Sequence, residues 1–249
     1  MGVRQRLRLG SGMAAIVLAV WLPSPAFAQT TKPSGDVAFG RSIALIRGHL
    51  LEGEELVKLH EWSAAYPHFA FPTEEIYGVI REELPSYQTP QFDHALKALA
   101  HTVRSHSIRQ YSKALAKVDA ALAAADAGLK VRQLDWPKFT MAVAVEVLKT
   151  AAEEYDNAIE DGRITHATGY RTARGFVLQA DRMIEHAVAE MPGSDPAAFA
   201  DIRIDMSKIR SAFAGQSAPE RLTIDQKAFE QAVSNVQLAL QKLAASGKI

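Results

Sequence analysis

Apolar residues recur at spacings of three, four and seven along most of the chain. In the first such stretch, Ile43, Ile46, Leu50 and Val57 fall on one stripe, which is typical of an amphipathic α-helix. Alternating runs of β-branched residues bounded by turn residues are almost absent, and Ala, Leu, Glu, Lys and Gln dominate. The pattern therefore predicts an all-α fold.

Helix-breaking and capping residues divide this pattern into segments. Thr73, followed by two glutamates, predicts a helix N-terminus after Pro72 has ended the preceding helix. Gly128 is expected to close a long helix as its C′ residue, and Asp135 is expected to cap the next one. The expected helices cover residues 36–61, 63–69, 73–84, 90–126, 139–160, 166–191, 196–214 and 223–245. Long helices joined by short loops predict a mostly antiparallel bundle of about six to seven helices with an N-terminal helical hairpin.

The first residues have the features of a secretory signal peptide. Three arginines precede an apolar run at 13–22, and Ala-Phe-Ala at 26–28 is a typical cleavage sequence. We expect cleavage between Ala28 and Gln29, a periplasmic or secreted mature protein, and no transmembrane helix in that mature chain. The expected domains are a signal peptide at 1–28, a helical bundle at 29–191 and a C-terminal helical hairpin at 192–249, packed on the bundle.

Composition narrows the chemistry further. The chain has 28 basic and 28 acidic residues and no cysteine. Loss of the signal-peptide arginines leaves a slight acidic excess, so a nucleic-acid partner is not expected. Without cysteine, disulfides, thiolate metal sites and cysteine nucleophiles are excluded, and any metal or acid–base chemistry depends on His, Asp and Glu.

The common catalytic motifs are missing from the sequence. It contains no phosphate-binding loop, no dinucleotide-binding glycine motif, no nucleophile elbow in the mature chain and no His-Glu-x-x-His. The two Glu-x-x-His pairs of a di-iron bundle are also missing. We therefore expect a non-catalytic protein, with an enzyme lacking a recognisable motif as the remaining alternative.

Histidine is unusually concentrated in one part of the chain. Six of the eight histidines lie between residues 49 and 106. His49 and Glu52 are three apart on one helical face, and His68 and Glu75 are expected to approach them from the following turn and helix. These four residues are the predicted ligands of a transition-metal ion, iron or copper. The structural alternative is that each histidine is an ordinary surface or interhelical hydrogen-bonding residue.

Aromatic residues gather in the same region. Five of them lie within sixteen residues, and they form either a local core or a partner-binding surface: Trp62, Tyr66, Phe69, Phe71 and Tyr77. The stretch from Gly53 through Trp62 and Ala65 to Phe69 resembles a single tetratricopeptide hairpin. Since no second copy follows, this resemblance implies one helical hairpin in which Trp62, Ala65 and Phe69 are packing residues.

Two further resemblances concern metal uptake. The stretch Gly48-His49-x-x-Glu52 resembles the Gly-x-His-x-x-Glu hallmark of the imelysin group of periplasmic helical proteins, with the glycine one position later. The residues from Glu154-Tyr155 through Asp161-Gly162 to Tyr170 are similar to the exported helical segment of some bacterial iron permeases. Both resemblances imply a periplasmic helical protein associated with iron uptake and an envelope transporter.

Two functions remain open at this point. The first is a non-catalytic periplasmic binding protein that holds a metal ion through His49, Glu52, His68 and Glu75. The second is a protein–protein interaction module that uses the aromatic hairpin.

Overall fold

The computed structural model describes residues 34–191, 196–213, 215, 219 and 221–245. The signal peptide expected at 1–28, its cleavage site and most of the loop at 192–195 lie outside these residues. The described helices are α1 (Gly35–Lys58), α2 (Trp62–Phe71), α3 (Gly78–Ile80), α4 (Asp93–Arg104), α5 (Ile108–Lys130), α6 (Trp136–Asn157), α7 (Ala167–Glu190), α8 (Ala200–Ser211) and α9 (Gln226–Ala245). Shorter elements are a π-helical turn η1 (Pro72–Tyr77), the 3₁₀ turns η2 (Leu84–Tyr87) and η3 (Pro196–Phe199), and the strands β1 (Ile159–Glu160) and β2 (Arg163–Ile164). The predicted all-α fold is confirmed.

Aspartate side chains cap the first turns of α6 and α9, and the cap at Asp135 is expected from the sequence. The side chain of Asp135 accepts a hydrogen bond from the backbone N–H of Lys138 at 3.0 Å, at the start of α6. Asp225 accepts one from Ala228 N–H at 2.8 Å, one residue before α9. Each carboxylate satisfies an N–H that has no partner within its helix.

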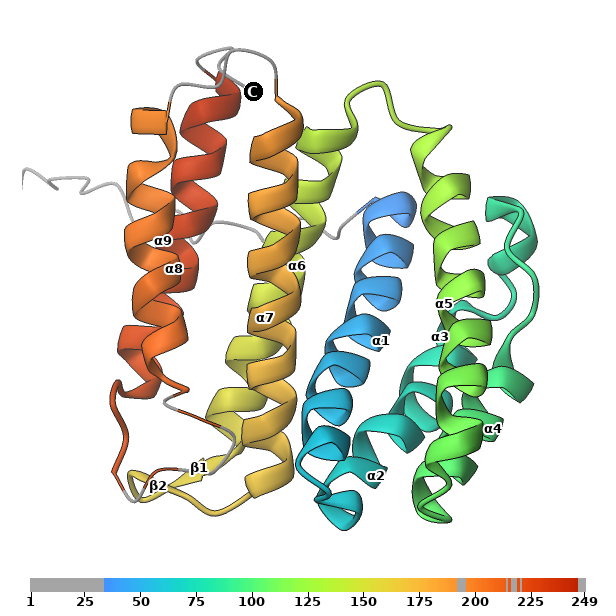
Figure 1. Cartoon of the computed structure of the whole chain (residues 1–249). Coiled ribbons are helices and arrows are strands. Elements are labelled where there is room, and N and C mark those ends of the chain that lie inside the picture. Colours follow the sequence, from blue (N-terminus) through green and yellow to red (C-terminus); the bar gives the residue numbers. More distant parts are fainter. Residues whose placement is uncertain (1–33, 192–195, 214, 216–218, 220, 246–249) are drawn as a thin grey trace, which may run out of the picture. The chain divides into compact units, whose positions relative to one another are not determined.

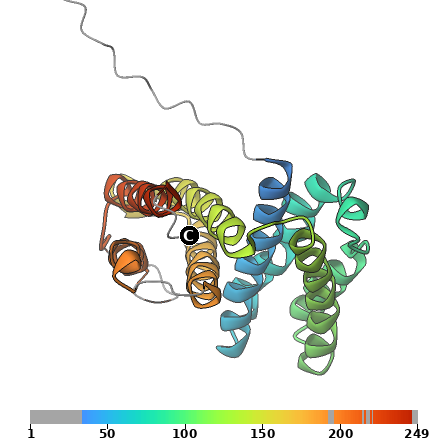
Figure 2. The ribbon, with the colours of Figure 1, turned by 90° about the horizontal axis from the view of Figure 1, so that it is seen from above.

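The helices pack in two connected groups. Helices α6, α7, α8 and α9, which we call the C-terminal bundle, contact one another in a closed ring of neighbours, α6 with α7, α7 with α8, α8 with α9 and α9 with α6 (Figure 2). Helix α1 packs on α6 and α7 and also on α2 and α5 (Figure 1). The N-terminal group, α1 to α5, is therefore joined to the C-terminal bundle mainly through α1. The described helices lie in one compact unit, and the domain division expected at residue 192 stays a prediction.

Aromatic side chains fill the centre of the C-terminal bundle. Tyr155 on α6 stacks on Phe229 of α9 with ring centroids 4.7 Å apart, and its hydroxyl donates to the carbonyl of Ile224 at 2.8 Å. The hydroxyl of Tyr170 on α7 donates to the carbonyl of Ala212 at 3.2 Å. These contacts hold Ala212, just after α8, against α7 and Ile224, just before α9, against α6.

The expected long helix at 90–126 is wrong, because the chain breaks into α4 and α5. The break lies at Ser105–Ser107, where His106 has a φ of 52°. The hydroxyl of Ser105 donates to the carbonyl of His101 at 2.8 Å, and Ser107 N–H donates to the carbonyl of Thr102 at 2.8 Å. These local bonds replace the helical ones, so α5 turns back against α4.

Gly128 lies inside α5 and is not the expected C′ residue. A Cβ atom at this position would lie only 1.8 Å from the carbonyl oxygen of Tyr87. The glycine is therefore needed for a close backbone approach to η2.

The helix break expected at Pro72 is also absent. Helix α2 continues through η1 into α3, and Thr73 caps nothing, since its buried hydroxyl has no hydrogen-bond partner. Pro72 falls in the first turn of the π-helical segment, where the altered hydrogen-bond pattern accommodates its missing N–H.

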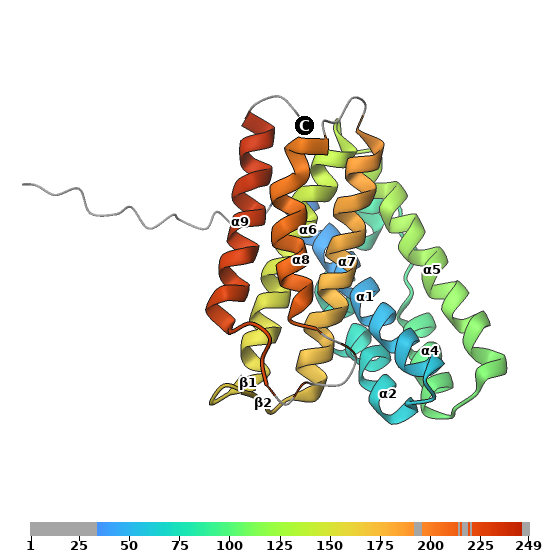
Figure 3. The same ribbon diagram turned by 60° about the vertical axis from the view of Figure 1, so that its left-hand side comes forward.

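A small hairpin follows α6, where a helix was expected to continue to residue 160 and the next one to begin at 166. Asp161 and Gly162 have φ values of 50° and 71°, as a two-residue hairpin turn requires. They connect β1 and β2, which pair antiparallel with Ile159 opposite Ile164, at one end of the C-terminal bundle (Figure 3).

Candidate functional site

Two histidines from different helices are buried side by side in the N-terminal group. His49 on α1 is 3% exposed and His68 on α2 is 0% exposed, and their ring centroids are 5.8 Å apart. Among the residues that the structure describes, neither ring nitrogen of His68 has a hydrogen-bond partner, and Nδ1 of His49 has none. The structure thus places these two of the four predicted ligands next to each other.

Burial keeps both imidazoles neutral. Loss of hydration lowers the pKa of His49 to about 3, with a smaller contribution from His68. Desolvation also lowers the pKa of His68 to about 3, and the charge of Arg171 adds to this effect. A neutral imidazole has a free lone pair, which is the form that binds a metal ion.

Glu52 lies one turn after His49 on α1 and is fully buried. One of its oxygens, Oε2, accepts a hydrogen bond from Arg174 of α7 at 2.5 Å, whereas Oε1 has no partner. Arg174 also pairs with Glu55 at 2.8 Å. Desolvation raises the pKa of Glu52, and Arg174 opposes that shift. We call His49, Glu52, His68 and Arg174 the buried polar cluster.

Glycines allow the helices that carry this cluster to approach closely. A Cβ atom on Gly175 of α7 would lie 2.4 Å from the carbonyl oxygen of Gly48 on α1. A Cβ atom on Gly53 would lie 2.5 Å from the ring of Phe69 on α2. The first contact brings α7 near enough for Arg174 to reach Glu52, and the second seats α2, which carries His68.

Glu75 is not part of this cluster. Its side chain is exposed on η1. Desolvation and the charge of Glu74 raise the pKa of Glu75, and the charge of Glu75 in turn helps to raise the pKa of Glu154. Over the residues that the structure describes, no three His, Asp or Glu side chains form a group arranged to hold a metal ion. The four predicted ligands are therefore not assembled in this conformation, and metal binding itself stays a prediction.

The five predicted partner-binding aromatics divide into two sets. Phe69 and Tyr77 are buried in the core, where Tyr77 packs edge-on against Phe92 at 5.0 Å. The side chains of the other set are half-buried, and they are Trp62, Tyr66 and Phe71. Trp62 stacks on His106 at 5.1 Å and Phe71 lies edge-on to His49 at 5.9 Å. Partner binding by these residues stays a prediction.

Sequence reasoning missed the α7 side of the cluster. Arg174 pairs with Glu52, Arg171 reaches Glu61 at 3.9 Å, and Phe176 lies edge-on to His49 at 5.0 Å. The available signal was a pair of arginines three residues apart in a helix whose neighbouring positions Thr172, Ala173 and Gly175 are small. Charged residues on such a face need buried partners.

The C-terminal part of the chain is similar to a known family. Residues 130–247 match the family model of the iron permease-associated 4-helix bundle domain. The matched residues begin at the end of α5 and include the whole C-terminal bundle and the β1–β2 hairpin. No curated protein and no solved structure matches the chain.

This match confirms the broader resemblance to iron-uptake proteins and does not extend to the imelysin group. The permease-like residues noted in the sequence, from Glu154 to Tyr170, lie inside the matched range. The similarity to the iron permease-associated domain is therefore limited to the C-terminal half of the chain, and His49, Glu52 and His68 lie outside the match. None of the described helices has the length and apolar character needed to span a membrane.

Proposed function

We propose that this chain is an exported, non-catalytic protein that binds a transition-metal ion and serves iron uptake together with an iron permease of the cell envelope. The observation that carries the proposal is the pair of buried, neutral histidines with unpartnered ring nitrogens. Leaving a buried polar group without a hydrogen bond costs about 1–3 kcal/mol. A bound ion offsets that cost, because it takes the lone pairs that the protein leaves free.

The spacing of the two rings is compatible with a shared ion. Nitrogens that bind one ion at about 2.1 Å each lie roughly 3–4 Å apart. Ring centroids 5.8 Å apart permit that separation when both rings turn a nitrogen inward. Glu52 is not assembled with the two rings as a third ligand in this conformation, where its carboxylate pairs with Arg174. Two imidazole nitrogens suit iron or copper. Glu75 is given no role, since it lies outside the buried polar cluster.

Export and transport are supported by other parts of the chain. The expected signal peptide supports a periplasmic or secreted location, and the match over residues 130–247 supports an iron permease as the partner. The absence of a catalytic motif supports a carrier over an enzyme. Iron is then the cargo, and the C-terminal bundle is the candidate surface for the transporter.

The proposal is tested by metal titration of the purified chain. Calorimetry and elemental analysis with Fe(II), Cu(II) and Zn(II) are expected to give about one ion per chain for one of these metals. His49→Ala and His68→Ala are expected to abolish binding. His94→Ala is the matched control, because His94 is an exposed histidine on α4.

Circular dichroism of each variant shows whether the fold is retained. His49→Gln and His68→Gln, which keep a polar side chain, provide a second pair if the alanine variants unfold. Absence of stoichiometric binding in the parent chain, or binding that survives loss of both histidines, would overturn the metal proposal. The half-buried aromatics Trp62, Tyr66 and Phe71 would then be the first surface to examine for a protein partner.

A further inference from the structure

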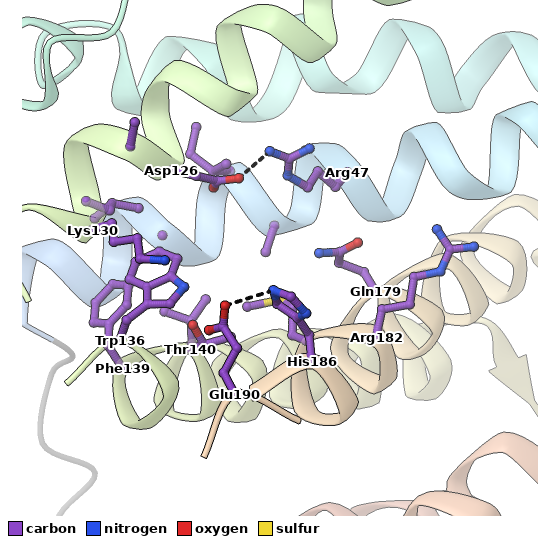
Figure 4. A pocket seen from close by; sticks show the side chains of 17 residues that line it. Arg47, Asp126, Lys130, Trp136, Phe139, Thr140, Gln179, Arg182, His186 and Glu190 are labelled. Carbon is purple, nitrogen blue, oxygen red and sulfur yellow. Dashed lines mark hydrogen bonds and ion pairs between the residues drawn. The ribbon is translucent and has the colours of Figure 1, made fainter. Parts of the chain in front are cut away.

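A second candidate site lies on the opposite side of α1 from the buried polar cluster. A hollow of about 450 Å³ opens between α1, α5, α6 and α7 (Figure 4). Its size falls within the range of about 300–1,000 Å³ that is usual for small-molecule sites. Nothing in the proposed metal-binding function uses this pocket.

One end of the pocket is aromatic. Trp136 and Phe139 of α6 stack with ring centroids 5.4 Å apart, and Lys130 of α5 lies over the Trp136 ring at 5.8 Å. All three residues line the pocket, and Figure 4 shows them together at one side. A flat apolar group placed here would cover the aromatic surface.

Polar side chains of α7 lie at the other end. Gln179 is 9% exposed, and its amide has no hydrogen-bond partner among the described residues. Arg182 is exposed beside it (Figure 4); it forms no close ion pair within the described part of the chain, and its charge acts on the more distant Glu54. In addition, the buried hydroxyl of Thr140, on the α6 wall, has no hydrogen-bond partner among the described residues. The pocket therefore holds unused hydrogen-bond donors and a guanidinium without a close ion pair.

The basic side chains of the pocket outnumber its acidic ones. Asp126 pairs with Arg47 at 2.5 Å, whereas Glu190 lies 3.5 Å from His186, an exposed histidine that balances its charge only when protonated. Lys130 and Arg182 therefore leave the lining with a small positive excess over Glu190. A bare metal cation would be repelled here, whereas an anion would be attracted.

We propose that this pocket binds a small aromatic carboxylate, with its ring system against Trp136 and Phe139 and its carboxylate toward Gln179 and Arg182. Guanidinium and amide N–H groups are suitable donors to a carboxylate. The site is formed jointly by α1, α5 and the C-terminal bundle.

The probe is naphthalene-2-carboxylate, titrated into the purified chain by calorimetry, with the neutral naphthalene-2-carboxamide as its matched ligand. The carboxylate is expected to bind at least about tenfold more tightly than the amide, a difference of about 1.4 kcal/mol. Added salt is expected to weaken the carboxylate and leave the amide unchanged.

Three variants separate the contributions. Arg182→Gln is expected to weaken the carboxylate about tenfold with no effect on the amide, and Trp136→Ala is expected to weaken both ligands. Arg81→Gln, an exposed arginine outside the pocket, is the control that changes neither. Since Arg182 is exposed, its replacement leaves the fold intact, which thermal unfolding checks.

Several outcomes overturn the proposal. They are no binding of the carboxylate at millimolar concentration, equal affinity for carboxylate and amide, or binding indifferent to Arg182→Gln. His49→Ala is expected to leave carboxylate binding unchanged, so failure of this pocket and failure of the metal site are distinguishable.

Discussion

Arg174 of α7 and Glu52 of α1 form a buried ion pair at 2.5 Å between the C-terminal bundle and the N-terminal group. The carboxylate is fully buried and the Arg174 side chain is 15% exposed. The pair therefore links the helices similar to an iron permease-associated domain with the helices that carry the two buried histidines.

Removal of Arg174 is expected to be strongly destabilising. Arg174→Met leaves the Glu52 carboxylate buried without its cation, which costs about 3–5 kcal/mol of unfolding free energy. The measurement is urea denaturation. Arg210→Met, which breaks the more exposed pair with Asp181, is the control and is expected to cost at most about 1 kcal/mol. Equal losses in the two variants would contradict a special role for the buried pair.

The close approach of α1 and α7 is expected to tolerate no side chain at Gly175. In Gly175→Ala the new methyl group would lie 2.4 Å from a backbone oxygen of α1, and overpacking costs about 1–3 kcal/mol. Gly169→Ala in the same helix is the matched control, since its nearest contact is 3.6 Å. That variant is expected to gain about 0.5–1 kcal/mol from the higher helix propensity of alanine. Thermal unfolding of both variants tests whether their stabilities change in opposite directions.

Stability is expected to fall in mild acid because of the two buried histidines. Their folded-state pKa values of about 3 lie below the ordinary histidine value of 6.5, so the unfolded chain binds more protons between these values. The stabilisation is complete above about pH 6.5 and is lost progressively as the pH falls toward 3. Urea unfolding midpoints, measured across this pH range with a metal chelator present, test whether stability falls as the pH falls.

The same experiment on variants assigns the effect. His68→Leu is expected to reduce the pH dependence below about pH 6.5, whereas His94→Leu, at an exposed position on α4, is expected to leave it unchanged. An identical slope in the parent chain and in His68→Leu would show that other groups cause the acid sensitivity.

The C-terminal helices are expected to unfold together with α6 and α7. Phe229→Ala removes a fully buried ring that stacks on Tyr155 and is expected to cost about 3–5 kcal/mol. Tyr155→Phe removes only the hydrogen bond to Ile224 and is expected to cost about 0.5–1.5 kcal/mol. Hydrogen exchange follows whether α8 and α9 open as one unit with α6. Protection lost only in α8 and α9 of Phe229→Ala would indicate a separate hairpin.

The sequence by itself determined the helical class and many helix ends. Apolar residues at spacings of three and four require one buried face on each helix, and Asp135 and Asp225 cap backbone N–H groups only a few residues away. Such interactions are local, so they can be read without knowledge of the fold. The likeness of the residues around Asp161 and Gly162 to iron permeases is also visible in the sequence alone, and these residues lie within the range that matches the family model.

Tertiary structure decided the features that depend on distant segments. Gly128 does not end a helix. It lies against the backbone of Tyr87, because another part of the chain passes close to it. His49 meets His68 because Gly53 admits the Phe69 ring, whereas Glu75, which follows closely in sequence, faces outward. Arg174 reaches Glu52 because two glycines let α1 and α7 touch. Pairing between residues far apart in the chain follows from how helices cross, which hydrophobic periodicity does not encode.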